Sequence, residues 1–181
     1  KKILLSAIGL IAVIAAACSY LFLQNSVKST SQRISDNAQA KLYLLPATGT
    51  QFSNNTEASI DVMLDTLGQN VTGVAAEIQY DNSKLTLTSI DKTGSSFGED
   101  NVTLNPSLAA NKLRIAADKP EDNPVTGNGK KIATLKFTTK ENGAAKVEFV
   151  GNNIVEIVVN GVSTNLTIEK VNGEYQIGNV S

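Results

Sequence analysis

The chain of 181 residues contains no histidine, no tryptophan and a single cysteine, Cys18. Without histidine, neither a Ser–His or Cys–His catalytic pair nor a histidine-ligated metal site can form. A single cysteine excludes a disulfide bond within the chain. Aromatic residues make up only 5% of the sequence, so few rings are available to stack against a sugar. These absences argue against an enzyme and give little support to a sugar-binding site.

Charged residues are also few, at 18% of the chain, and they are unevenly placed. Residues 1–40 hold four basic residues and one acidic residue, whereas residues 41–181 hold 12 basic and 16 acidic residues, a net charge of −4. A protein that binds nucleic acid needs a basic surface to neutralise phosphates, and this composition gives no sign of one. We therefore expect no nucleic-acid partner.

The longest hydrophobic run extends from Ile3 to Leu23 and contains no charged residue. A helix of this length, rising about 1.5 Å per residue, spans a hydrocarbon core of roughly 30 Å. We expect residues 1–23 to form a transmembrane signal-anchor that holds the rest of the chain on the extracytoplasmic side, at the cell surface. Two alternatives stay open: a cleaved signal peptide, and a lipoprotein signal in which Cys18, preceded by small residues, takes a lipid.

After the hydrophobic run, residues 24–40 are polar and rich in Ser, Asn and Gln, which predicts a linker or stalk. From residue 41 onward the apolar residues alternate with a period of two, the pattern of strands that bury one face. Nine segments show this alternation, at 41–45, 58–66, 74–80, 84–90, 112–118, 132–139, 145–150, 153–159 and 162–168, with 101–105 and 174–178 as weaker candidates.

The connections between these segments contain turn-forming residues. Asn-Gly pairs at Asn128-Gly129 and Asn142-Gly143 readily adopt the positive φ angles of tight turns. No segment of the body shows a helical period. The sequence therefore predicts an all-β domain over residues 41–181, a two-sheet antiparallel sandwich of about nine strands, preceded by one N-terminal transmembrane or signal helix.

The stretch LPATG, from Leu45 to Gly49, matches a sortase signal for attachment to a bacterial cell wall. Such a signal is followed closely by an apolar helix and a basic tail, whereas about 130 residues of strand-forming sequence follow it here. We interpret the stretch as the end of the first strand, because Pro46 ends strand pairing and Gly49 permits a turn.

Several stretches resemble the cohesin domain, a module of cellulosome scaffolds. They are TGVAAEIQYDNSKLTLTSI (72–90), GKKIATLKFTTK (129–140), NGAAKVEF (142–149) and NIVEIVVNGVSTNLTI (153–168). The resemblance covers roughly residues 41–168. It implies a nine-stranded, jelly-roll-like β-sandwich that uses one flat sheet face to bind a dockerin, a calcium-binding helical module.

The resemblance places this docking face on the strand at residues 74–80. The outward-facing residues Ala75, Glu77 and Gln79 are the predicted partner-binding face. Relatives that bind dockerin well often carry Asn and Asp at positions that fall near Gly73 and Ala75 here. This polar pair is therefore absent, and we expect a smooth, weakly charged face in its place.

A metal site has only weak candidates. Asp118, Glu121 and Asp122 lie in the stretch DKPEDNP and carry the hard oxygen ligands that calcium prefers. Their spacing fits no strict calcium-binding pattern, and two prolines stiffen the loop. We expect a solvated loop, and no cofactor.

These observations together predict a non-catalytic, surface-exposed binding module. Its expected partner is a dockerin-like protein, with a link to polysaccharide binding or breakdown as a further expectation of the resemblance. Two alternatives are kept: a carbohydrate-binding module, and a structural subunit of a pilus-like or surface-layer assembly.

Overall fold

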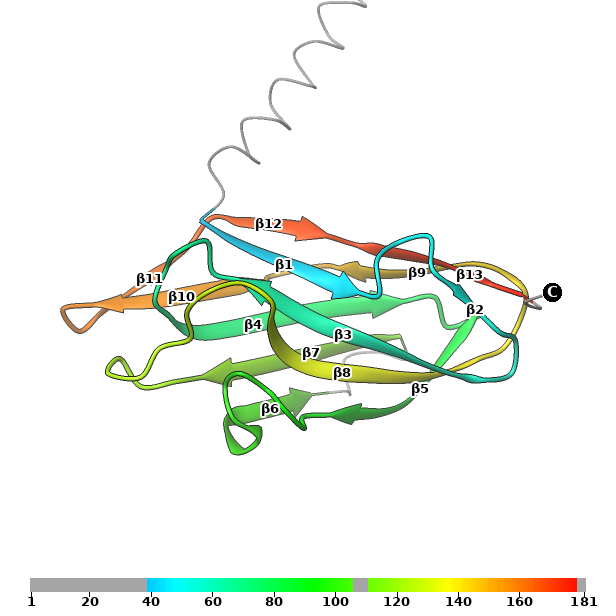
Figure 1. Ribbon diagram of the computed structural model, residues 1–181, viewed down its shortest axis with the longest axis horizontal. Coiled ribbons are helices and arrows are strands. Elements are labelled where there is room, and N and C mark those ends of the chain that lie inside the picture. The colour runs from blue at the N-terminus through cyan, green and yellow to red at the C-terminus, as the bar shows by residue number, and fades with distance from the viewer. Residues whose placement is uncertain (1–38, 106–110, 179–181) are drawn as a thin grey trace, which may run out of the picture. The chain divides into compact units, whose positions relative to one another are not determined.

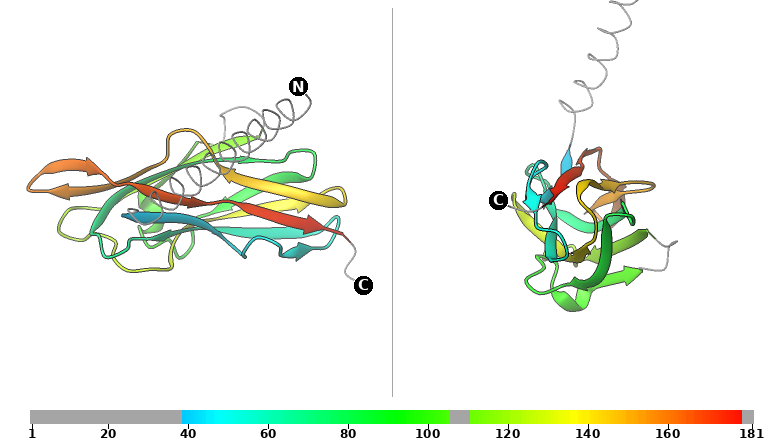
Figure 2. Two further views of the ribbon diagram at one scale, coloured as in Figure 1. Left: turned by 90° about the horizontal axis from the view of Figure 1, so that it is seen from above. Right: turned by 90° about the vertical axis from the view of Figure 1, so that its right-hand side faces the viewer.

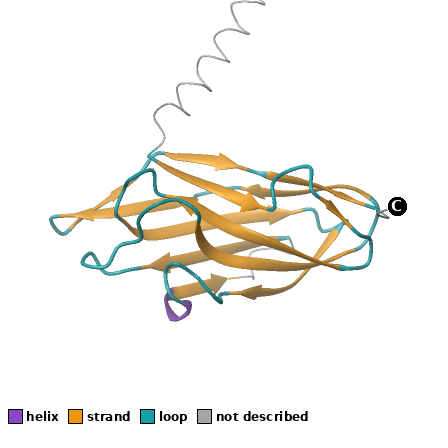
Figure 3. Cartoon of the chain, in the orientation of Figure 1, coloured by secondary structure: helices purple, strands orange, loops and turns teal. Residues whose placement is uncertain are grey.

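The computed structural model describes residues 39–105 and 111–178, and within them the chain is almost entirely strand and turn (Figure 3). The only helical element there is a short 3-10 turn, η1 (Glu99–Asn101), and no helix in the described ranges is long and apolar enough to cross a membrane. The predicted anchor at residues 1–23, Cys18 within it and nearly all of the predicted linker lie outside the described residues.

The strands form two sheets that stack as a sandwich (Figure 1). The five-stranded sheet, which we call sheet A, has its strands in the order β12 (Ile168–Val171), β1 (Ala40–Leu45), β3 (Glu57–Asp65), β8 (Lys130–Thr139) and β5 (Leu85–Asp91). The first strand begins at Ala40, one residue earlier than predicted, and Ala40 is already fully buried.

The second sheet, sheet B, has eight strands. Its main path runs β11 (Val162–Asn165), β10 (Ile154–Val159), β4 (Val71–Tyr80), β9 (Gly143–Phe149), β13 (Gly173–Ile177) and β2 (Gln51–Phe52). On the other side of β4 lies β7 (Lys112–Asp118), and β6 (Val102–Asn105) pairs with β7. The β10–β11 hairpin projects beyond the rest of the sandwich when the domain is seen from above (Figure 2).

The core between the sheets is built by the alternation that the sequence predicted. Ile60, Val62 and Leu64 of β3 are fully buried, as are Leu135 and Phe137 of β8. From sheet B, the same cluster receives Ala76 and Ile78 of β4, Leu113 and Ile115 of β7, and Val147 of β9. This core of aliphatic and aromatic side chains confirms the prediction of an all-β sandwich.

The strand pattern is more finely divided than predicted. The described residues form thirteen strand segments rather than about nine, partly because the predicted strand 162–168 is split. Leu166 turns into the core, its N–H donates to the carbonyl of Val155, and the chain passes from sheet B to sheet A between β11 and β12. Two pairings, β1 with β12 and β13 with β2, are parallel, so the sheets are not purely antiparallel.

The stretch LPATG forms a turn after β1, as predicted. Gly49 has φ = 86°, in the left-handed region that favours glycine. The Thr48 hydroxyl donates to the carbonyl of Glu174 (3.0 Å), and Thr48 Oγ1 accepts from the Glu174 N–H (2.9 Å). These bonds tie the stretch to β13, so it is an integral part of the sandwich.

Candidate docking face

The outer face of sheet B around β4 is the candidate site. Val74, Ala76 and Ile78 of this strand point into the core, so Gly73, Ala75, Glu77 and Gln79 point outward. β4 is flanked by β7 on one side and by β9 and β10 on the other. The structure therefore places the three predicted site residues, Ala75, Glu77 and Gln79, on one outer face in the middle of a sheet.

Strand register sets the neighbours of these residues across the face. Ala75 lies between Ile154 of β10 and Ala116 of β7. One step along β4, Gly73 lies between Glu156 and Asp118. In the other direction Glu77 is paired with Arg114, and Gln79 lies between Lys112 of β7 and Glu148 of β9. The face is thus apolar in the middle and carries carboxylates at the Gly73 end.

The middle of this face is hollowed into a shallow depression of about 190 Å³. Ala75 lies at its floor, on the central strand β4, and is only 6% exposed. The residues that line the depression are Gly73, Val74, Ala75, Ala116, Ala117, Asp118, Ile154 and Glu156. We call it the β4 depression. Its floor is apolar and two of its rim residues are acidic.

The backbone beneath Glu77 is held by the connection between β9 and β10. The Glu77 N–H donates to Asn153 Oδ1 (2.9 Å), and the N–H of Val150 donates to the Glu77 carbonyl (2.9 Å). The Asn153 side chain is itself fixed, because its Nδ2 donates to the carbonyl of Val150 (2.9 Å). The connection thus supplies the hydrogen-bond partners of β4 at Glu77, where neither β9 nor β10 pairs with this strand.

Arg114 crosses this part of the face. Its Nη1 donates to the carbonyl of Asn152 (3.2 Å), which lies on the far side of β4 from β7. The guanidinium group therefore reaches over β4, next to Glu77, instead of extending into solvent.

Comparison with known proteins identifies the fold and the family. The family model described as "Cohesin domain" matches residues 45–177, about three quarters of the chain. The chain belongs to the cohesin family. Cohesin domains are non-catalytic binding modules, so membership confirms the prediction of a binding module rather than an enzyme. No curated protein matches the chain.

Solved structures resemble the cohesin domain closely in fold and distantly in sequence. The seventh ScaB type I cohesin of Pseudobacteroides cellulosolvens has a TM-score of 0.65 and 12% identity, covering 78% of this chain and 94% of that one. The sixth cohesin of Acetivibrio cellulolyticus scaffoldin B was solved with a mutant Cel5 dockerin. It has a TM-score of 0.64 and 16% identity, covering 76% of this chain and 98% of that one. The third ScaB cohesin of R. flavefaciens was solved with a group 1 dockerin. It has a TM-score of 0.59 and 19% identity, covering 80% of this chain and 98% of that one.

Tyr80 and Asp81, which lie in the stretch 72–90 that resembles the cohesin domain, have a structural role. The Ser83 hydroxyl donates to Asp81 Oδ1 (2.6 Å) and, with the Ser83 N–H (2.9 Å), holds the pKa of the Asp81 carboxyl below its usual range. Tyr80 packs its ring against Phe137, with ring centroids 5.2 Å apart. The motif therefore closes β4 with a turn and anchors its end to sheet A.

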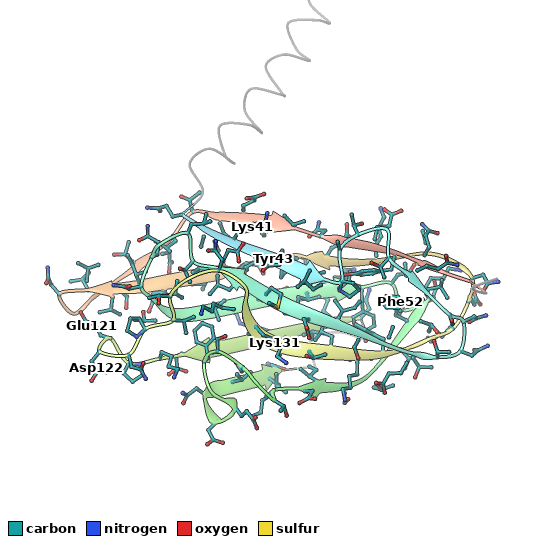
Figure 4. The ribbon with its side chains drawn as sticks, viewed as in Figure 1. Lys41, Tyr43, Phe52, Glu121, Asp122 and Lys131 are labelled. Carbon is teal, nitrogen blue, oxygen red and sulfur yellow. The ribbon has the colours of Figure 1, made fainter. Side chains whose placement is uncertain are left out.

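The weak calcium candidates are not brought together. Asp118 ends β7 on the candidate face, whereas Glu121 and Asp122 lie in the loop that follows, where Figure 4 shows both at the outer boundary of the domain. Among the described residues, no group of three or more Cys, Asp or Glu side chains is arranged to hold a metal ion. Asp118 instead belongs to the rim of the β4 depression.

Four residues of the candidate face were missed by sequence reasoning: Arg114, Ala116, Ile154 and Glu156. Their own segments show the alternation that puts them on an outer face. The pattern of one strand does not reveal which strand lies beside it, so their position next to β4 could not be read from the sequence. In the structure β4 pairs with β7 along one edge, and with β9 and β10 along the other.

Proposed function

We propose that this cohesin domain binds a dockerin through the outer face of β7, β4 and β10. Membership of the cohesin family supports this proposal, and so do the relatives of the same fold that were solved with dockerins. The observation that carries it is the centre of the face, where Ala75 and Ala116 lie side by side with no large side chain between β10 and β7. A rigid sheet with a low centre suits a helical partner.

The experiment is a calorimetric titration of the full chain with a panel of dockerin modules in the presence of calcium. We expect Glu77→Lys and Ala75→Arg to weaken dockerin binding while leaving the circular dichroism spectrum unchanged, because both side chains point outward. The matched control is Glu57→Lys, an exposed carboxylate on β3 of the opposite sheet, which should bind as the unaltered chain does.

Three results would count against the proposal. If Glu77→Lys left binding unchanged while changes in the 118–124 loop abolished it, the partner would contact the loop and not the sheet face. Tight retention on polysaccharide with no dockerin bound would favour a carbohydrate-binding module instead. Filaments in sheared surface fractions would favour the structural alternative.

We also propose that the domain is displayed on the extracytoplasmic side of a membrane, held there by the uncharged run from Ile3 to Leu23. Two lysines precede this run, and a polar stretch separates it from the sandwich. Fractionation tests this: the full chain should sediment with membranes and resist extraction by salt and alkali. Release into the soluble fraction would contradict the anchor.

A further inference from the structure

We propose that the β4 depression selects a partner helix that carries one aliphatic side chain and, three or four residues away, a lysine or arginine that meets Asp118 and Glu156. The inference rests on the proposed function, since it describes what the docking face recognises. This chain lacks the polar pair at positions 73 and 75. The inference assigns recognition of the partner to four other residues instead: Ala116, Ile154, Asp118 and Glu156.

The shape of the depression supports an aliphatic occupant. An apolar cavity of about 150 Å³ is large enough to hold a benzene molecule. The β4 depression, at about 190 Å³, therefore accommodates one side chain of the size of leucine or methionine. Gly73 keeps it open at one end: a Cβ placed there would already lie 3.5 Å from Cβ of Glu156, so a larger side chain would fill the space.

The charges at the rim support a basic neighbour. Asp118 and Glu156 lie opposite each other across Gly73, on the two strands that flank β4, so their Cα atoms are about 10 Å apart. Within the part of the chain that the structure describes, neither carboxylate forms an ion pair. The Glu156 carboxylate accepts a hydrogen bond from the Ser163 hydroxyl (3.2 Å). Of the two cations of β7 on this face, Arg114 is directed to Asn152, and Lys112 lies beside Gln79, away from the Gly73 end.

The spacing of the two features matches a helix. Ala75 and Gly73 are two residues apart on one strand, which is roughly 7 Å. Side chains three or four residues apart on a helix have Cβ atoms about 5–6 Å apart and project from the same side. One helix can thus place an aliphatic residue over Ala75 and a basic residue between the two carboxylates, where a partly desolvated charge pair is stronger than an exposed one.

A display experiment tests the inference. The full chain is the bait, and the probe is a library on a dockerin scaffold in which the exposed helix positions are randomised. We expect the recovered clones to share Leu, Ile, Val or Met three or four residues from Lys or Arg. Ala116→Leu, which fills the depression, should weaken their binding about tenfold or more, and Glu156→Gln and Asp118→Asn should each weaken it about three- to tenfold. The loss from the two charge changes should shrink as ionic strength rises.

Matched controls separate this inference from the proposed function. Ala144→Leu, at an exposed position of β9, and Glu57→Gln, on the opposite sheet, should leave binding unchanged. The inference is overturned, and the docking face stands, if the clones fail to bind Ala75→Arg but bind three other variants normally: Ala116→Leu, Glu156→Gln and Asp118→Asn. Recovery of no clones, or of clones insensitive to Ala75→Arg, would overturn the docking face and the inference with it.

Discussion

The carboxylate of Glu77 lies directly against Gly151. A Cβ built on Gly151 would stand 2.5 Å from Oε2 of Glu77, and Gly151 has φ = 61°, in the left-handed region. Gly151 therefore leaves room for the Glu77 carboxylate beside the β9–β10 connection, and a Cβ at position 151 would push this flexible side chain away from its place on the candidate face. Position 77 is the middle of the predicted site, so the same glycine decides where its carboxylate lies.

Gly151→Ala should destabilise the domain and displace Glu77. The positive φ alone costs about 1–2 kcal/mol for a residue with a Cβ, and the overlap with Glu77 adds to this cost. Chemical denaturation measures the free energy of unfolding. The control is Gly161→Ala, which has φ = 74° and nothing within 4 Å of the added Cβ, so it isolates the backbone cost.

A second change separates the two costs at position 151. Adding Glu77→Ala to Gly151→Ala removes the overlapping carboxylate, and we expect it to recover the part of the loss that exceeds the Gly161→Ala value. No recovery would show that the overlap is relieved in another way, for example by rotation of the Glu77 side chain into solvent.

Tyr175 should make the domain sensitive to alkaline pH. Burial raises the pKa of this phenol from its ordinary value of 10.0 to about 12. The folded state therefore keeps the neutral phenol, whereas the unfolded chain ionises first. The resulting stability is fully present below pH 10 and is lost progressively as the pH rises toward 12.

Tyr175→Phe is the test of this pH dependence. It keeps the ring, whose centroid lies 5.4 Å from that of Phe52, and removes the hydroxyl that donates to the carbonyl of Pro46 (3.1 Å). We expect a loss of about 1 kcal/mol at neutral pH from the missing hydrogen bond. Above pH 10 the loss of stability with pH should be shallower than in the unaltered chain. An identical alkaline transition in both proteins would exclude Tyr175 as its cause.

Thr139 ties the end of β8 to the connection between β2 and β3 through its buried hydroxyl. Oγ1 accepts from the N–H of Thr56 (3.0 Å) and donates to the carbonyl of Ser53 (2.8 Å). Thr139→Val keeps the volume but leaves both backbone groups without this partner, which should cost about 1–3 kcal/mol in a urea titration. Thr138→Val, at the exposed neighbouring position, is the control and should change stability little.

The alternation of apolar residues was sufficient to predict the core because each strand buries one face. The bounds 112–118 match β7, and Ile60, Val62 and Leu64 are buried as predicted. Alternation does not reveal how deeply a residue on the outer face is covered. Met63 lies on the outer face of β3, between Tyr43 of β1 and Lys131 of β8, and is outside the core cluster, yet it is only 7% exposed.

The candidate site was only half predictable for a related reason. Ala75, Glu77 and Gln79 could be placed on an outer face from their own strand. Glu156 lies far along the chain and reaches this face only because β10 pairs with the first half of β4 while β9 pairs with the second half. The sequence of neither strand shows a periodic pattern that reveals this sharing of one edge of β4. The two rim carboxylates, Asp118 and Glu156, can therefore be placed together only from the register of the strands in the structure.

The last prediction concerns the polar pair that the family often carries. Gly73→Asn together with Ala75→Asp should still allow the domain to fold. Both positions lie on the outer face, Gly73 does not require a positive φ, and its nearest neighbour atom would be at an ordinary contact distance of 3.5 Å. The new amide and carboxylate would fill the apolar floor and add a charge beside Asp118 and Glu156.

We therefore expect this double variant to exchange partners. It should lose binding to clones selected for an aliphatic residue, since burying that residue against the new carboxylate at position 75 would desolvate the carboxylate without giving it a partner. It should gain affinity for dockerins that place hydroxyl or amide donors at the centre of their contact, as measured by titration of both partners against both chains. A variant that keeps its original clones would show that the centre of the face does not set specificity, and recognition would then rest on the rim carboxylates alone.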